Sequence, residues 1–155
     1  MGYRSEVTLT IYEKDYKELL RQAIKGKNDD VISLIRYAGL YKKSDIITLH
    51  WDWVKWYEEY PDIRFIMDFI LSNDIPYSFK RVGENTGDIE ELSYDDEYDF
   101  ADATYVSCCI DLNDVGEMQD RNFYIDKIKT EADKIENAEL EPVSEDELFA
   151  IIATQ

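Results

Sequence analysis

The chain opens on an alternation of apolar and polar residues, and this pattern constrains the fold more than any other feature. In SEVTLTIY (residues 5–12), Val7, Leu9 and Ile11 fall on one side of the segment. A period of two predicts a half-buried β-strand. Directly afterwards, apolar residues recur every three or four positions, which predicts an amphipathic helix that ends near Gly26.

The remaining elements of the first 112 residues follow from the same reading of spacing. A second helix is predicted to begin at Asn28 or Asp29 and to stop at Gly39. A third is predicted to begin at Pro61 and to end before the SNDIP stretch. Strands are predicted over residues 44–51, 77–82, 88–94 and 103–112. The order β-α-α-β-α-β-β-β predicts an α+β fold: an antiparallel sheet of about five strands with helices packed on one face.

The C-terminal part of the chain has a different character. Residues 1–114 are predicted to form the α+β domain, and residues 115–155 an acidic, helical C-terminal extension of the same domain. One helix is indicated by the spacing of Ile125, Ile128, Ala132 and Ile135. A short second helix, with Ser144 and Glu147 as its capping box, is expected near the end of the chain.

Charge is distributed unevenly along the chain. Residues 1–81 contain 13 basic and 13 acidic residues, whereas residues 82–155 contain 4 basic and 22 acidic residues. The whole formal net charge of −18 therefore comes from the second half. Such an asymmetry indicates an interaction surface. An acidic surface repels nucleic acid and anionic membranes and attracts basic partners, of which nucleic-acid-binding proteins are the commonest.

Several classes of protein are disfavoured by simple features of the sequence. No apolar run approaches 18 residues, so a membrane span is not expected. No basic segment leads an apolar one at the start, so no secretory signal is expected and the predicted location is the cytoplasm. Cys108 and Cys109 are neighbours whose side chains would point to opposite faces of a strand. They are predicted to be reduced, packed thiols.

Catalytic, cofactor and metal sites are not predicted. His50 is the single histidine, and a position in a Trp-rich strand favours a structural role over that of a general base. A small hydrolase or metal-dependent enzyme would need a cleft that contains His50 and several carboxylates. One histidine and two adjacent cysteines are a poor set of transition-metal ligands. The segment 111–117 (DLNDVGE) fails the calcium-loop pattern, because Val115 stands at the fifth position.

Three strings of the sequence resemble a known group of proteins. They are MGYRSEVTLTIY (1–12), WVKWYEEYPDI (53–63) and RVGENTGDIEE (81–91). They are similar to a family of small, uncharacterised phage and prophage proteins that begin MGYRS[ED]V, with a KWY…YP segment and an R[IV]GE…DIEE hairpin. The resemblance covers residues 1–110 and implies a phage or mobile-element origin and an α+β domain. It implies no activity.

The function predicted from these observations is inhibition by nucleic-acid mimicry. The protein would be a phage-encoded acidic inhibitor of the anti-CRISPR or anti-restriction type. It would block a basic nucleic-acid-binding complex of the host without itself binding nucleic acid. The alternative is an accessory protein that binds a partner through its aromatic surface, with the acids only solubilising it. The oligomeric state is left open. The predicted partner-binding residues are the acids Glu84, Asp88, Glu90, Glu91, Asp95, Asp96, Glu97, Asp99, Asp102, Glu139, Glu141, Glu145, Asp146 and Glu147, and the tryptophans Trp53 and Trp56.

Overall fold

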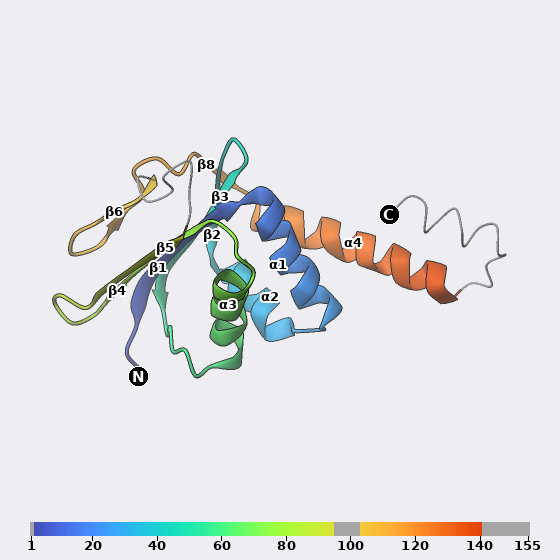
Figure 1. Cartoon of the computed structure of the whole chain (residues 1–155), viewed down its shortest axis with the longest axis horizontal. Helices are drawn as coiled ribbons and strands as arrows, with labels where there is room; N and C mark the ends of the chain where they lie inside the picture. Colours follow the sequence, from blue (N-terminus) through green and yellow to red (C-terminus); the bar gives the residue numbers. More distant parts are fainter. Residues whose placement is uncertain (1, 95–102, 141–155) are drawn as a thin grey trace.

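A computed structural model describes residues 2–94 and 103–140, with only the backbone for 136–140. Its main sheet has six strands in the order β5-β4-β1-β3-β2-β8, and each strand is antiparallel to its neighbours (Figure 1). The α+β class and the antiparallel sheet predicted from the sequence are confirmed. The strands are β1 (Ser5–Tyr12), β2 (Gly39–Lys43), β3 (Ile46–Val54), β4 (Tyr77–Gly83), β5 (Ile89–Tyr94) and β8 (Glu117–Gln119).

The helices lie together on one face of this sheet (Figure 1). They are α1 (Glu13–Lys25), α2 (Asp29–Tyr37), α3 (Pro61–Ser72) and α4 (Arg121–Leu140). The side chain of Asn28 caps α2 by accepting a hydrogen bond from the backbone N–H of Val31 at 3.4 Å. The helix ends at Tyr37, just before Gly39 as predicted, but Gly39 is the first residue of β2 and not a left-handed cap, because Ala38 already has extended backbone angles.

The core lies between the helices and the face of the sheet that carries Val7, Leu9 and Ile11, all of which are fully buried. Aromatic rings fill the middle of this layer. Trp56 packs against Trp51 and Phe79, with ring centroids 5.1 Å and 5.8 Å apart respectively. The alternation of residues 5–12 therefore places one complete set of side chains in the main core.

The opposite face of the sheet is polar and also largely buried. Its buried side chains are Thr8, Thr10, Thr48, Ser78 and Lys80. Among the described residues, hydrogen bonds attach the segment after residue 103 to this face. Lys80 Nζ donates to the carbonyl oxygen of Thr104 at 2.7 Å, and the N–H of Ile110 donates to Glu6 Oε1, also at 2.7 Å. The first strand is thus covered on both sides, whereas its alternation predicted that one side faces water.

The predicted single strand over residues 103–112 is wrong. This segment forms a small two-stranded sheet of its own, β6 (Tyr105–Val106) paired with β7 (Ile110–Asp111). Cys108 and Cys109 lie in the turn between them, and both are free and exposed, so the prediction of packed thiols is also wrong. The electrostatic effect of the neighbouring Cys108, together with a hydrogen bond between the two side chains, raises the pKa of Cys109.

The beginning of the C-terminal extension contributes to the same sheet and core. β8 pairs with β2, and α4 packs against α1 through Ile125 and Ile128, which are buried. Farther along the helix, Ile135 is 60% exposed, and the end of α4 leaves the body of the protein (Figure 1). The second helix predicted around Ser144 lies outside the described residues. In the described part of the chain, no helix has the length and apolar character needed to cross a membrane.

Candidate functional site

The acidic segment predicted to bind a partner begins in the β4–β5 hairpin at one edge of the sheet. In this hairpin Asp88 is held by its neighbours: Arg81 donates to both carboxylate oxygens, at 2.8 Å and 3.1 Å, and the Tyr3 hydroxyl donates to one of them. The Arg81 guanidinium and then the Tyr3 hydroxyl lower the pKa of Asp88 to about 2. Asp88 therefore fixes the turn, and its charge is largely neutralised within the protein.

The other described acids of this hairpin differ in how far they reach solvent. Glu84 is exposed and accepts a hydrogen bond from the backbone N–H of Arg4 at 2.8 Å. Glu90 is half-buried and lies 3.8 Å from Arg81, so part of its charge is also offset. Glu91 is exposed on β5. Glu84 and Glu91 are therefore the hairpin acids best placed to meet a partner.

The structure does not describe most of the predicted partner-binding acids. Asp95, Asp96, Glu97, Asp99, Asp102, Glu141, Glu145, Asp146 and Glu147 lie outside the described residues. Glu139 lies within α4, where the structure gives the backbone alone. Of the fourteen predicted acids, the four in the hairpin therefore have described side chains.

The two predicted tryptophans lie in different environments. Trp53 is 51% exposed, whereas Trp56 is 7% exposed and packs between Trp51 and Phe79. Trp56 is a core residue and cannot form part of a surface for a partner. Trp53 lies next to an irregularity in the β1–β3 pairing: Ser5 pairs with Val54 but Val7 pairs with Trp51, so β3 has one extra residue here. Such a β-bulge turns side chains out of the regular alternation and is frequent beside functional sites.

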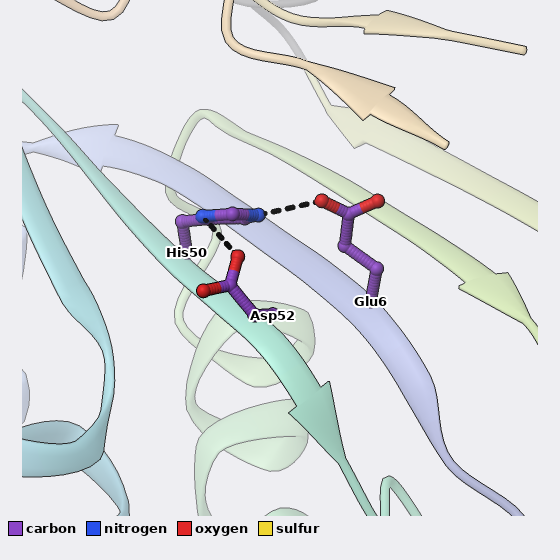
Figure 2. A group of neighbouring side chains, drawn as sticks. All are labelled: Glu6, His50 and Asp52. Atoms are coloured by element: carbon purple, nitrogen blue, oxygen red, sulfur yellow. Dashed lines mark hydrogen bonds and ion pairs between the residues drawn. The ribbon is translucent and has the colours of Figure 1, made fainter.

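A cluster of three ionisable side chains lies on the polar face of the sheet (Figure 2). His50 Nε2 lies 2.7 Å from Glu6 Oε2, and His50 Nδ1 lies 3.3 Å from Asp52 Oδ1. The imidazole is 10% exposed and the Glu6 side chain 19%, whereas Asp52 is 88% exposed. Within the described ranges, these three residues form the one group of histidine and carboxylate ligands close enough together to hold a metal ion.

A pocket of about 290 Å³ opens beside His50 and Asp52, and Glu6 does not line it. The rest of its wall comes from Tyr37, Gly39, Tyr41, Met118 and Arg121. The guanidinium of Arg121 donates to the backbone carbonyl oxygens of Arg36 and Tyr37, which holds a positive charge at the pocket. The pocket therefore places an imidazole, a carboxylate and a cation around one small volume.

Reasoning from the sequence missed this cluster because its members come together only through strand pairing. Glu6 and His50 are 44 positions apart, and they meet because Thr8 pairs with His50 in the β1–β3 register. Glu6 and Asp52 also look like ordinary solvent-facing acids in alternating segments. The one available signal was that His50 and Asp52 are two residues apart in a predicted strand, and so share a face.

Comparisons with known proteins add no identification. No protein family, no curated protein and no solved structure matches this chain. The resemblance to phage and prophage proteins consequently stays a prediction. Any proposal of function has to depend on the chain's own charge, surface and side-chain geometry.

Proposed function

We propose that this protein is a non-enzymatic inhibitor that occupies a basic nucleic-acid-binding surface of another protein. The observation that carries the proposal is the segregation of charge, since residues 82–155 hold 22 acids and 4 bases while the first half is neutral. Solubility alone requires a far smaller net charge. Concentrated like charge also destabilises a fold, so its placement in one half favours a role in recognition.

The rigid attachment of the acidic hairpin to the sheet supports mimicry of a nucleic acid. Glu84 and Glu91 extend from a sheet edge whose turn is fixed by Arg81, Asp88 and Tyr3. Side chains on one face of a strand repeat about every 7 Å, and double-stranded DNA carries one negative charge per roughly 1.7 Å of axis. A sheet edge therefore holds these acids on a rigid support, and the acids that follow Tyr94 in the sequence would add to the charge density.

The partner class follows from the charge. A positively charged channel that holds a nucleic-acid duplex is the complementary surface, and CRISPR effectors hold their heteroduplex in such a channel. Restriction enzymes likewise bind DNA. The proposed target is therefore a CRISPR effector or a restriction enzyme of the host, which makes the protein an inhibitor of the anti-CRISPR or anti-restriction kind, and the proposed site of action is the host cytoplasm.

Charge reversal tests the proposal. A variant with Asp95, Asp96, Glu97 and Asp99 changed to Lys should lose inhibition of DNA binding by purified effector complexes and restriction enzymes. The matched control changes four exposed acids of the neutral half, Asp45, Glu58, Glu59 and Asp68, to Lys, and alters net charge equally. The control should keep most of its inhibition, and the wild type should lose affinity steeply as salt rises. Equal inhibition by both variants would show that this acidic segment is not the binding surface.

A second candidate function is favoured by the exposure of Trp53. A half-exposed tryptophan at a β-bulge is a typical interface anchor, because Trp residues dominate the energetic hot spots of protein interfaces. If the protein binds a partner through this surface, Trp53→Ala should abolish binding while the fold survives. Added salt should then have little effect, which distinguishes this candidate from charge mimicry.

A further inference from the structure

We propose that His50 and Asp52 form a binding site for a divalent transition metal ion of the Zn²⁺ class, with Glu6 orienting the imidazole. The site lies on the polar face of the sheet, on strands β1 and β3 (Figure 2). It uses none of the acids to which the proposed function is assigned.

The separation of the two ligand atoms fits one metal ion. His50 Nδ1 and Asp52 Oδ1 are 3.3 Å apart. In a tetrahedral Zn²⁺ site, Zn–N and Zn–O distances of about 2.0–2.1 Å place neighbouring ligand atoms roughly 3.3–3.4 Å apart. A 3.3 Å separation is long for a charge-assisted hydrogen bond between a ring nitrogen and a carboxylate, which is usually about 2.7–2.9 Å. The pair is thus spaced as co-ligands.

Glu6 supplies the support that metal-binding histidines usually have. Its Oε2 lies 2.7 Å from His50 Nε2, and its Oε1 accepts the backbone N–H of Ile110 at 2.7 Å. With both oxygens held, the carboxylate keeps the proton on Nε2 and leaves the Nδ1 lone pair directed away from Glu6. A ligating histidine that donates its other N–H to a carboxylate is the common arrangement at zinc sites.

The backbone of β3 explains how Asp52 comes to face His50 while remaining exposed. The β-bulge places one extra residue between Trp51 and Val54, so the regular pairing of β3 with β1 continues as far as Trp51. His50 and Asp52 are two residues apart on β3 and so lie on the same face, and Asp52, next to the bulge, has 88% of its side chain exposed. A metal ion could reach both ligand atoms from solvent without any rearrangement of the core.

His50 and Asp52 also line the pocket that contains Tyr41, Met118 and Arg121, so an ion held between them would adjoin this pocket. Two protein ligands leave two positions of a tetrahedral ion for water or for a small anion. The Arg121 guanidinium, held by backbone carbonyls, favours an anion there. Glu6 lies at Nε2 and Asp52 at Nδ1, so an ion bound at Nδ1 together with Asp52 makes Glu6 a positioning residue.

The competing arrangement is a structural imidazolium. A ring with protons on both nitrogens could donate to Glu6 and to Asp52 without any metal. The two arrangements differ at one atom, Nδ1, and the chain contains a single histidine. The ¹⁵N resonances of the ring nitrogens therefore report on this site alone, whatever other acids bind ions.

The test is a Zn²⁺ titration of the full-length, ¹⁵N-labelled protein in a Cys108→Ser/Cys109→Ser background, which removes the exposed thiols as competing ligands. We expect saturable binding that shifts the Nδ1 resonance to that of a metal-bound nitrogen while Nε2 keeps its proton. Mg²⁺ should produce no such shift, because it prefers oxygen ligands. If both ring nitrogens stay protonated at a tenfold excess of Zn²⁺, the proposal is wrong and the cluster is a structural imidazolium.

Variants separate the two roles. Asp52→Asn should weaken Zn²⁺ binding at least tenfold, and Glu6→Gln should weaken it by about 10- to 100-fold, the usual effect of losing such a support. Asp68→Asn, an exposed acid on α3 among the helices, is the matched control and should bind as the wild type does. Equal affinity in Asp52→Asn and Asp68→Asn would overturn the assignment of Asp52 as a ligand.

Discussion

Arg81 on β4 forms a two-pronged ion pair with Asp88 across the β4–β5 hairpin, through N···O distances of 2.8 Å and 3.1 Å. The pair lies in the hairpin that also carries Glu84, Glu90 and Glu91. The same arginine lies within 3.8 Å of Glu90 and donates to the Ser5 hydroxyl. One cation thus ties the acidic hairpin to the first strand, which keeps the exposed acids on a defined support.

Replacing Asp88 with Asn should destabilise the protein by about 1 kcal/mol at neutral pH. This figure allows for solvent screening of the ion pair, because the Asp88 side chain is 33% exposed. The pKa of Asp88 is lowered in the folded state, to about 2. Its contribution to stability is therefore complete above the unfolded pKa near 4, and is lost as the pH falls from about 4 to 2.

Urea unfolding of wild type and Asp88→Asn from pH 7 to pH 2 measures this dependence. The difference in unfolding free energy should shrink towards zero below pH 3. Glu91→Gln removes an exposed acid on the same hairpin and should change stability little at any pH. A pH-independent difference for Asp88→Asn would mean that the ion pair does not stabilise the hairpin.

Gly116 and Gly87 both have positive φ angles, of 87° and 83°, but their surroundings differ. A Cβ at Gly116 would lie 2.2 Å from the carbonyl oxygen of Lys42, whereas a Cβ at Gly87 would have nothing within 4 Å. Gly87→Ala should cost only the backbone term, about 1 kcal/mol, and Gly116→Ala about 3 kcal/mol or more because β8 must move from β2. Thermal unfolding of the two variants would compare these costs, and equal costs would contradict the close approach.

The two tryptophans should respond oppositely to truncation. Trp56→Ala removes a ring packed between Trp51 and Phe79, and should cost roughly 3–5 kcal/mol. Trp53→Ala, at a half-exposed position, should change stability by no more than about 0.5 kcal/mol. Denaturant unfolding at equilibrium provides the comparison. A large loss on truncating Trp53 would place it in the core and remove it as a partner anchor.

Two isoleucines in α4 give a matched pair for the helix. Ile125 is fully buried and Ile135 is 60% exposed, although both belong to the same predicted apolar stripe. Ile125→Ala should cost about 2–5 kcal/mol, and Ile135→Ala no more than about 0.5 kcal/mol. Hydrogen exchange of α4 amides should show the first turns protected far more than the last. Equal losses of stability in the Ile125→Ala and Ile135→Ala variants would mean that α4 packs against the protein along its whole length.

The features predicted correctly from sequence are those encoded by neighbouring residues. The strand at Ser5–Tyr12, the helix at Glu13–Lys25 and the start of α3 at Pro61 all arise from local periodicity or capping. β2 was missed because GLYKK has no alternation, and its turn into β3 uses Ser44 at a φ of 57° instead of a glycine. A non-glycine residue in that region gives no recognisable signal.

Features that depend on contacts between distant segments could not be read from the sequence. Alternation continues without a break through Cys108 and Cys109, yet the chain turns there, because β6 and β7 pair with each other beside the polar face. Burial of Trp56 depends on Phe79 from β4. The meeting of Glu6 with His50 depends on the register of β1 against β3. For Trp56 and Glu6, the contacting residue lies more than 20 positions away in the sequence. For β6 and β7, the two strands are joined by a turn that contains no glycine.

The exposed turn at Cys108 and Cys109 gives the protein a built-in attachment point for chemical labels. The chain has no other cysteines, so a maleimide dye or nitroxide would report from one known location. Changing either cysteine to serine leaves a single label. The backbone N–H of Ile110, directly after this turn, donates a hydrogen bond to Glu6. A label on Cys108 or Cys109 therefore lies close to the polar face of the sheet. Distance measurements from that label to a bound partner would map the orientation of a complex without any engineered cysteine.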